Sequence, residues 1–146
     1  MQIRRAQPDD AAGLEALYRE LVPRDPNIRV APERVAALEH DPHNHLLVAE
    51  LDGELCGSAF LTLCLDPMYS FQPYGVVENV IVHSARRSQG AGRALLAELE
   101  RVARAARCTK LMLLSSATRF GAHAFFERLG YDGVHKRGFV KYLNRT

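Results

Sequence analysis

The middle of the chain alternates between apolar and polar residues, which is typical of half-buried β-strands. His45–Leu51 and Glu54–Leu65 are both strand-like, and the pair Asp52-Gly53 separates them. Asp-Gly favours the tight two-residue turn that joins antiparallel strands. The pattern therefore predicts a β-hairpin over residues 45–65.

On both sides of this hairpin, apolar residues recur at helical spacing. A first helix is predicted after Pro8-Asp9-Asp10, where acidic residues suit a helix start. A second is predicted from Pro32 to near Asp41-Pro42, a third after Gly92, and a fourth that ends at Gly130. The apolar stripes of the first, third and fourth helices consist of Leu14, Leu17, Tyr18 and Leu21; Leu95, Leu96, Leu99, Val102 and Ala106; and Ala122, Phe125, Phe126 and Leu129.

Further strand-like segments complete the predicted order of elements. They are Gln2–Gln7, Tyr74–His83, Thr109–Leu114 and Gly138–Leu143. The order is then β-α-α-β-β-β-α-β-α-β, in which an antiparallel meander leads into a right-handed β-α-β unit with parallel strands. We therefore expect an α/β (α+β) fold, with a mixed, twisted sheet and helices on both faces.

Length and composition limit the classes of protein that fit. The 146 residues suit one domain spanning 1–146, and 47% hydrophobic with 25% charged residues is ordinary for a globular protein. A net charge of +2 gives no argument for nucleic acid. No stretch reaches the length of a membrane span, and the first residues lack the apolar core of a signal peptide.

The cysteines and histidines do not form a metal-ligand pattern. Cys56, Cys64 and Cys108 each lie in an apolar run, so we interpret them as small buried thiols. Free thiols favour a reducing compartment, and we expect a cytoplasmic protein. His40, His43 and His45 are irregularly spaced around a turn, and no metal is expected.

The chemistry is concentrated in residues 80–93, which run from a strand through a tight turn into a helix. The first N–H groups of a helix have no partner within the helix, and its dipole adds partial positive charge there. Gly90 and Gly92 let a ligand approach the backbone, and Arg87 and Arg93 add charge. These features predict a site for a pyrophosphate. The structural alternative is that the glycines only ease a turn.

Two established phosphate motifs do not fit this segment. A P-loop needs Lys-Ser or Lys-Thr after the glycines, and a dinucleotide fingerprint needs a small residue where Leu95 stands. Arg87-x-x-Gly90-x-Gly92 instead matches the R/Q-x-x-G-x-G/A signature of GNAT acyltransferases. The stretch 122–131, AHAFFERLGY, is similar to that family's A-x-x-F-Y-E-x-L-G-F. The chain thus resembles a GNAT N-acetyltransferase over nearly its whole length.

The resemblance implies a GNAT fold with six to seven strands and acetyl-CoA as co-substrate. It also implies that the strand containing Val80–Val82 splays from the strand beginning at Lys110, and that the pantetheine arm lies between them. The amides of 89–93 would then hold the pyrophosphate, and an N–H near Val82 would polarise the thioester carbonyl. The cofactor-binding residues implied in this way are Val80, Ile81, Val82, Arg87, Ser88, Gln89, Gly90, Ala91, Gly92, Arg93, Ser115, Arg119 and Phe126.

Catalysis in this family typically proceeds by direct attack of the amine in a ternary complex, and a group or water chain must first take a proton from the amine. Glu78 is the candidate base; the alternatives for it are a structural ion pair or a bulge residue. Glu78-Asn79 followed by Val-Ile-Val also resembles the corresponding strand of glucosamine-6-phosphate N-acetyltransferases.

The general acid expected from the family is missing, because Phe126 stands where many members have Tyr. Water, Ser115, Ser116 or Tyr131 are the alternatives as proton donor. Arg119 and His123 match a pattern of aminoalkylphosphonate N-acetyltransferases. For Arg119 the alternatives are contact with the cofactor, contact with an anionic substrate, and a solvated position without a functional role. His123 would be a base or a packed histidine.

The predicted function is acetyl transfer from acetyl-CoA to a primary amine of a small molecule. The alternatives are acetylation of a protein Lys or N-terminus, and a non-catalytic acyl-CoA-binding module. No nucleic-acid or membrane partner is expected. A homodimer through the expected strand Gly138–Leu143 is a further option implied by the resemblance.

Overall fold

A computed structural model describes residues 1–144 of the chain. These residues form two compact units, Met1–Met112 and the part from Leu113 onward, and each unit is described by itself. The organisation of the whole chain as one domain stays a prediction. The elements are β1 Gln2–Arg5, α1 Ala11–Leu21, α2 Pro32–Leu38, β2 Asn44–Leu51, β3 Glu54–Leu65, β4 Pro73–Val82, α3 Ala91–Ala105, β5 Leu111–Leu113 and α4 Phe120–Arg128.

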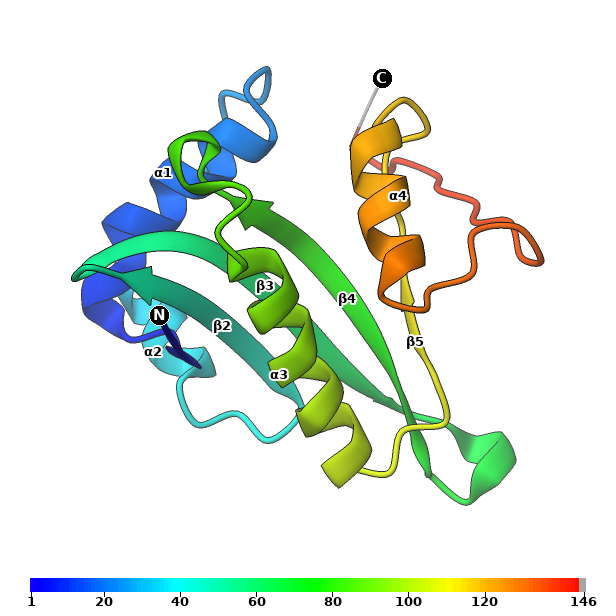
Figure 1. The fold of residues 1–146 in the computed structure, drawn as a ribbon. Coiled ribbons are helices and arrows are strands. Elements are labelled where there is room, and N and C mark those ends of the chain that lie inside the picture. Colours follow the sequence, from blue (N-terminus) through cyan, green and yellow to red (C-terminus); the bar gives the residue numbers. More distant parts are fainter. Residues whose placement is uncertain (145–146) are drawn as a thin grey trace. The chain divides into compact units, whose positions relative to one another are not determined.

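The strands form one sheet in the order β1-β2-β3-β4-β5 (Figure 1). The first four pair antiparallel with their neighbours. Next to β4, the N–H of Thr109 donates to the Pro73 carbonyl and the N–H of Gly75 donates to the Lys110 carbonyl, both at 2.9 Å. Both segments run in the same direction at these bonds, so the sheet is mixed, as predicted.

The β2–β3 hairpin confirms the strongest local prediction. Asp52 and Gly53 both have positive φ, 54° and 79°, as the two central residues of a type I′ turn require. β3 has the expected bounds, and β2 begins one residue before the expected start. A two-residue turn sets the register, so the pairing of Leu51 with Glu54 follows directly from the turn.

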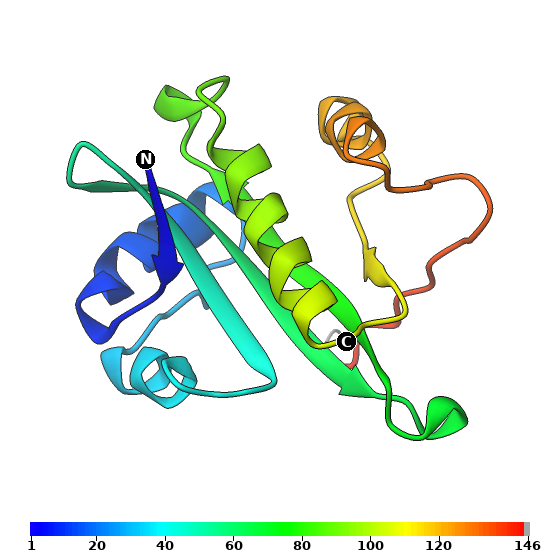
Figure 2. The same ribbon diagram turned by 60° about the horizontal axis from the view of Figure 1, so that its bottom comes forward.

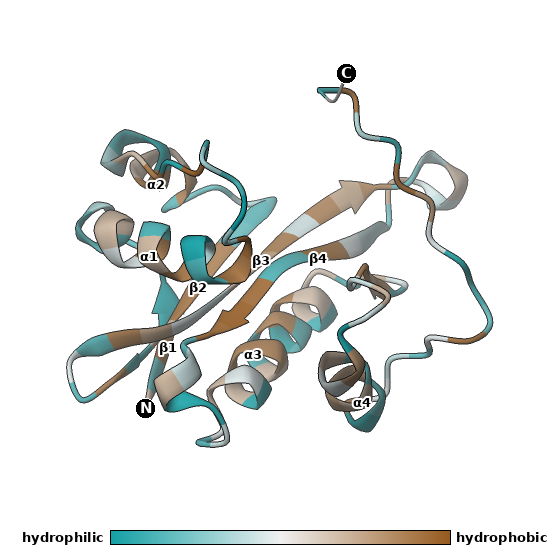
Figure 3. Cartoon of the chain, turned by 90° about the horizontal axis from the view of Figure 1, so that it is seen from above, coloured by the Kyte–Doolittle hydropathy of each residue, from teal (hydrophilic) through white to brown (hydrophobic). Residues whose placement is uncertain are grey.

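Helices cover both faces of the sheet in the first unit. α1 and α2 lie on one face, where Leu14 and Val35 pack with Val48 in the core (Figure 2). α3 lies on the other face and buries Leu95 and Leu99 completely. Figure 3 shows apolar strand residues between these layers. Burial of one stripe of each amphipathic helix is the main force that holds these layers together.

Ion pairs of Arg4 connect β1 to Asp10, just before α1, and to Glu50 of β2. Arg4 donates to both carboxylate oxygens of Asp10, at 2.7 and 3.0 Å, and also bonds Glu50. Burial alone would raise the pKa of the Asp10 carboxyl. Hydrogen bonds from Arg4 and the Gln7 N–H outweigh that effect, and the pKa lies below its usual value.

The prediction of six to seven strands is wrong, because residues 1–144 form a sheet of five. The expected final strand, Gly138–Leu143, has no regular secondary structure. Phe139 and Leu143 are 87% and 88% exposed. A strand persists only where a neighbouring strand takes its N–H and C=O groups, and alternation of apolar residues does not supply that neighbour. The proposed dimer loses the strand on which it rested, and dimerisation stays a prediction.

No helix within residues 1–144 is long and apolar enough to cross a membrane. The same residues contain no group of three or more His, Cys, Asp or Glu side chains arranged to hold a metal ion.

Candidate functional site

A β-bulge interrupts β4 just before the turn. Phe60 pairs with Glu78 and Ser58 pairs with Ile81, so Asn79 and Val80 together lie opposite the single residue Ala59. Asn79 takes the left-handed conformation, with φ of 55°, which Asn tolerates better than most residues. The bulge therefore lies directly after Glu78, at the start of the segment 80–93 that the sequence singles out.

The bulge changes which side chains face each layer. Without an extra residue, Glu78 and Ile81 would point to opposite faces of the sheet. With it, both share the face covered by α1 and α2, because their partners Phe60 and Ser58 are two residues apart on β3. Ile81 is buried there, whereas Glu78 is exposed and makes no ion pair or side-chain hydrogen bond with a described residue.

The outer edge of β4 is open at its carboxyl end in the first unit. The His83 N–H donates to the Cys56 carbonyl of β3 at 2.8 Å. Alternation along an antiparallel pair then directs the N–H of Val82 away from β3. The bonds that join Pro73 and Gly75 to the chain before β5 lie at the other end of β4, and no strand of residues 1–112 lies along the edge at Val80–Val82.

The chain between β4 and α3 turns sharply. A short 3-10 helix spans Ser84–Arg86, and His83 caps it because its Nδ1 accepts the Ala85 N–H at 3.0 Å. Ser88 and Gly90 both have positive φ, 64° and 88°. Gly90 is the residue that precedes α3, and a β-carbon at this position would meet nothing within 4 Å. The turn thus leaves open space above its glycine.

A run of main-chain N–H groups is unpaired at this turn. Ala94 is the first residue of α3 to donate within the helix, to the Gly90 carbonyl at 3.0 Å. Between described residues, no hydrogen bond is donated by the N–H groups of 88–93. These donors lie at the positive end of a helix of 15 residues, where partial positive charge accumulates. The arrangement suits a ligand with several anionic oxygens.

The arginines around the turn differ in their surroundings. Arg87 donates from Nε to the Val82 carbonyl at 3.2 Å and keeps a side chain that is 58% exposed. Arg93 is exposed and forms no ion pair with a described residue. Arg86 lies 3.5 Å from both Asp52 and Glu54 of the hairpin. Arg87 and Arg93 are therefore the exposed arginines at the turn, and Arg87 also lies 3.6 Å from Oε1 of Glu20.

The second unit contains the remaining predicted residues. Phe126 is buried in α4, with its ring 5.4 Å from that of Phe125 and 6.0 Å from that of Tyr131. Arg119 precedes α4 and is exposed. The Ser115 hydroxyl is buried and has no hydrogen-bond partner among residues 1–144. The Nε2 of His123 lies 2.8 Å from the Ser116 carbonyl, which favours the packed-histidine interpretation.

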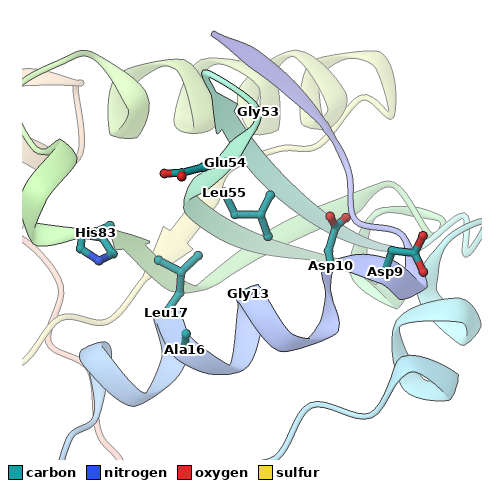
Figure 4. Close-up of a pocket in the computed structure, with 9 residues that line it drawn as sticks. All are labelled: Asp9, Asp10, Gly13, Ala16, Leu17, Gly53, Glu54, Leu55 and His83. Carbon is teal, nitrogen blue, oxygen red and sulfur yellow. The ribbon is translucent and has the colours of Figure 1, made fainter.

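An open depression of about 430 Å³ lies elsewhere on the first unit, between α1 and the β2–β3 turn (Figure 4). Its lining consists of Asp9, Asp10, Gly13, Ala16, Leu17, Gly53, Glu54, Leu55 and His83. His83 is its connection to the turn before α3. None of the predicted site residues lines it, so its volume does not identify the site.

Comparisons with known proteins identify the family. Residues 14–131 match the model of the acetyltransferase (GNAT) family. The chain belongs to that family. A curated relative, the aminoalkylphosphonate N-acetyltransferase of Salmonella typhimurium, is 30% identical over 142 residues, covering 97% of this chain and 91% of the relative.

Solved structures agree on the fold. One from Agrobacterium tumefaciens strain C58 has a TM-score of 0.87 at 33% identity, over 97% of this chain and 99% of that one. Glucosamine-6-phosphate N-acetyltransferase from Arabidopsis thaliana has a TM-score of 0.83 at 19% identity, over 98% of each chain, and shows the fold alone. The protein is thus a GNAT acetyltransferase, an acyl-CoA-dependent transferase.

For this GNAT domain, the structure brings one predicted group of residues together in the first unit. That group consists of Glu78, Val80, Ile81, Val82, Arg87, Ser88, Gln89, Gly90, Ala91, Gly92 and Arg93. Ser115, Arg119 and Phe126 belong to the second unit, and their role stays a prediction. Sequence reasoning missed Glu20 of α1, which contacts the turn. No local signal identifies it, because it is 64 positions away from its partner Ser84.

Proposed function

We propose that this protein transfers an acetyl group from acetyl-CoA to a primary amine of a small molecule. The observation that carries the proposal is the row of unpaired N–H groups at 88–93, which fits the diphosphate of coenzyme A. Support for a small acceptor comes from the Salmonella relative, whose name specifies an aminoalkylphosphonate.

Two neighbouring segments of the first unit suit two neighbouring parts of coenzyme A. The N–H groups of 88–93 would bind the diphosphate, and Arg87 and Arg93 would add charge. The open edge at Val80–Val82 offers main-chain groups to the extended pantetheine arm, as a neighbouring strand would. Bound there, acetyl-CoA supplies an activated acetyl thioester and a thiolate leaving group.

Glu78 is the proposed base. An alkylamine has a pKa near ~10.4 and is mostly protonated at neutral pH, so a proton must leave before the nitrogen can attack. Glu78 is exposed at the bulge, and no described partner competes for its carboxylate. A bulge often re-aims a side chain next to an active site. This position supports transfer of the proton to Glu78, directly or through one water.

The proton donor for the leaving thiolate is proposed to be water or the Ser115 hydroxyl. Phe126 has no proton to donate, and its ring lies near those of Phe125 and Tyr131. Ser115 has a hydroxyl without a hydrogen-bond partner among residues 1–144. A thiol pKa near ~8.5 means that the leaving group needs only modest help.

Calorimetry with acetyl-CoA and an assay of thiol release over a panel of amines test the proposal together. The panel should contain an aminoalkylphosphonate, an amino sugar phosphate, simple diamines and a lysine peptide. We expect binding of acetyl-CoA and turnover with a small amine. Turnover with the peptide alone would favour protein acetylation, and binding without any turnover would favour an acyl-CoA-binding module. Failure of folded protein to bind acetyl-CoA would refute the cofactor site.

A further inference from the structure

A carboxylate from α1 reaches the turn that precedes α3. The Oε1 of Glu20 accepts the Ser84 N–H at 2.8 Å and lies 3.6 Å from Nη2 of Arg87. Its Oε2 lies 4.0 Å from Nε2 of His83. One side chain thus meets the turn at the backbone, at the capping histidine and at the arginine of the GNAT signature.

The location of Glu20 is unfavourable by the ordinary rules for helices. It lies in the last turn of α1, where the helix dipole disfavours negative charge. It also brings a carboxylate close to a site that we propose for phosphates, which opposes their binding. Lys or Arg at this position would suit both the end of the helix and a nearby phosphate better than Glu does. The presence of Glu20 is therefore explained by neither helix stability nor attraction of phosphate.

Those contacts stabilise the ionised carboxylate. Partial burial raises the pKa of Glu20, but the hydrogen bonds from Ser84 and the positive charge of Arg87 outweigh it and lower the pKa overall. The Glu20 side chain is 26% exposed and the Arg87 side chain 58%, so their contact lies near the protein surface. Glu20 is therefore charged at neutral pH and tied to the turn.

Arg87 is held from two directions. Its Nε donates to the Val82 carbonyl at the end of β4, and its Nη2 faces Glu20. An exposed arginine free of such contacts would sample many rotamers and would lose that freedom when it binds a phosphate. Contacts that restrict it beforehand reduce this loss.

We infer that Glu20 is a positioning residue for acetyl-CoA, which acts by holding the backbone at Ser84 and the guanidinium of Arg87 in the arrangement that receives the cofactor. The inference rests on the proposed function of the 88–93 turn. It adds a residue of α1, outside both sequence motifs, to the determinants of cofactor affinity.

A double-mutant cycle with calorimetric measurement of acetyl-CoA affinity tests this inference. Glu20→Ala should weaken binding about tenfold, because it removes both contacts. Glu20→Gln keeps an acceptor for the Ser84 N–H and should lose only about threefold. In an Arg87→Ala background, the loss from Glu20→Ala should shrink to about threefold, because one of its two contacts is already gone.

Glu15→Gln is the matched control. Glu15 lies on the same helix, accepts the Val30 N–H at 2.9 Å and lies 3.2 Å from Arg19, but it contacts no residue of the turn. It has a similar exposure, 29% against 26% for Glu20. This variant should bind acetyl-CoA with the affinity of the wild type.

Several outcomes would overturn the inference while leaving the proposed function intact. They are unchanged affinity in both Glu20 variants, tighter binding after Glu20→Ala, and full additivity of the Glu20 and Arg87 effects. Steady-state kinetics give a second readout, in which KM for acetyl-CoA should rise while kcat and KM for the amine stay unchanged. If Glu20→Ala does not fold, Glu20→Gln decides alone. Wild-type protein that binds no acetyl-CoA would instead refute the proposed function.

Discussion

Replacement of Gly90 by Ala tests the cofactor turn most directly. Gly90 precedes α3 with φ of 88°, and a β-carbon there would meet no protein atom within 4 Å. The substitution therefore introduces no clash within the protein. Its two consequences are backbone strain in the free protein and a methyl group in the space above the unpaired N–H groups.

The two consequences differ in size. An L-residue with left-handed backbone costs roughly 1–2 kcal/mol, and the reduced freedom of the unfolded chain returns about 0.5 kcal/mol. We expect a net loss of about 1 kcal/mol in the free energy of unfolding, or about 3 °C in Tm. A methyl group that keeps a phosphate away from even one N–H would cost about 2 kcal/mol, so acetyl-CoA affinity should fall about thirtyfold.

Gly53→Ala is the matched control for backbone strain. Gly53 has φ of 79° and equally open surroundings, but it lies in the β2–β3 turn. Thermal unfolding should show similar losses for both variants, and calorimetry should show weaker acetyl-CoA binding for Gly90→Ala alone. If Gly90→Ala bound acetyl-CoA like the wild type, the proposal that the diphosphate lies against this turn would be wrong.

Three more predictions concern charged groups. Glu78→Gln should lower kcat about a hundredfold and flatten the rise of rate with pH; an unaltered pH profile would exclude Glu78 as the base. Arg87→Ala should weaken acetyl-CoA binding about tenfold in low salt and less at 0.5 M salt, measured by calorimetry; equal losses at both salt concentrations would contradict a charge contact. Asp10→Asn should destabilise the fold by about 2 kcal/mol at pH 7, because Arg4 loses one of its two charged partners and keeps only Glu50. Since the pKa of Asp10 is lowered on folding, its contribution is complete above the unfolded pKa, about 4, and declines as pH falls below it. Denaturant titrations at pH 7 and pH 3 should therefore show a smaller difference between wild type and Asp10→Asn at pH 3.

Much of the fold follows from short-range patterns. Asp52-Gly53 predicts its hairpin because the turn type depends on the two residues in it and sets the register of both strands. The stripe Leu95, Leu96 and Leu99 predicts α3 in the same way, since one helix face must be buried. Segment Gly138–Leu143 shows where such reasoning fails. Its residues are compatible with a strand, but a strand also needs a hydrogen-bonding neighbour.

The candidate site also has one part that the sequence predicts and one part that depends on contacts between distant residues. Arg87, Gly90 and Gly92 are recognisable in the sequence because the turn and the helix start are built from consecutive residues. From the sequence, a bulge was only one alternative for Glu78 itself. The structure places the extra residue at Asn79 and Val80, because a bulge in β4 is defined by its pairing with β3. That pairing decides that Glu78 and Ile81 share a face.

The sequence by itself determined most of the elements, the position of the glycine-containing turn before α3 and the resemblance to GNAT acetyltransferases, because each depends on neighbouring residues and the backbone they favour. Only the tertiary structure decided which face Glu78 occupies and that Glu20 meets Ser84 across 64 positions. Contacts of that kind depend on how separate elements pack. The packing of α1 is set by the burial of the apolar faces of all the helices and the sheet together. No local pattern in α1 therefore specifies which of its residues contacts the turn before α3.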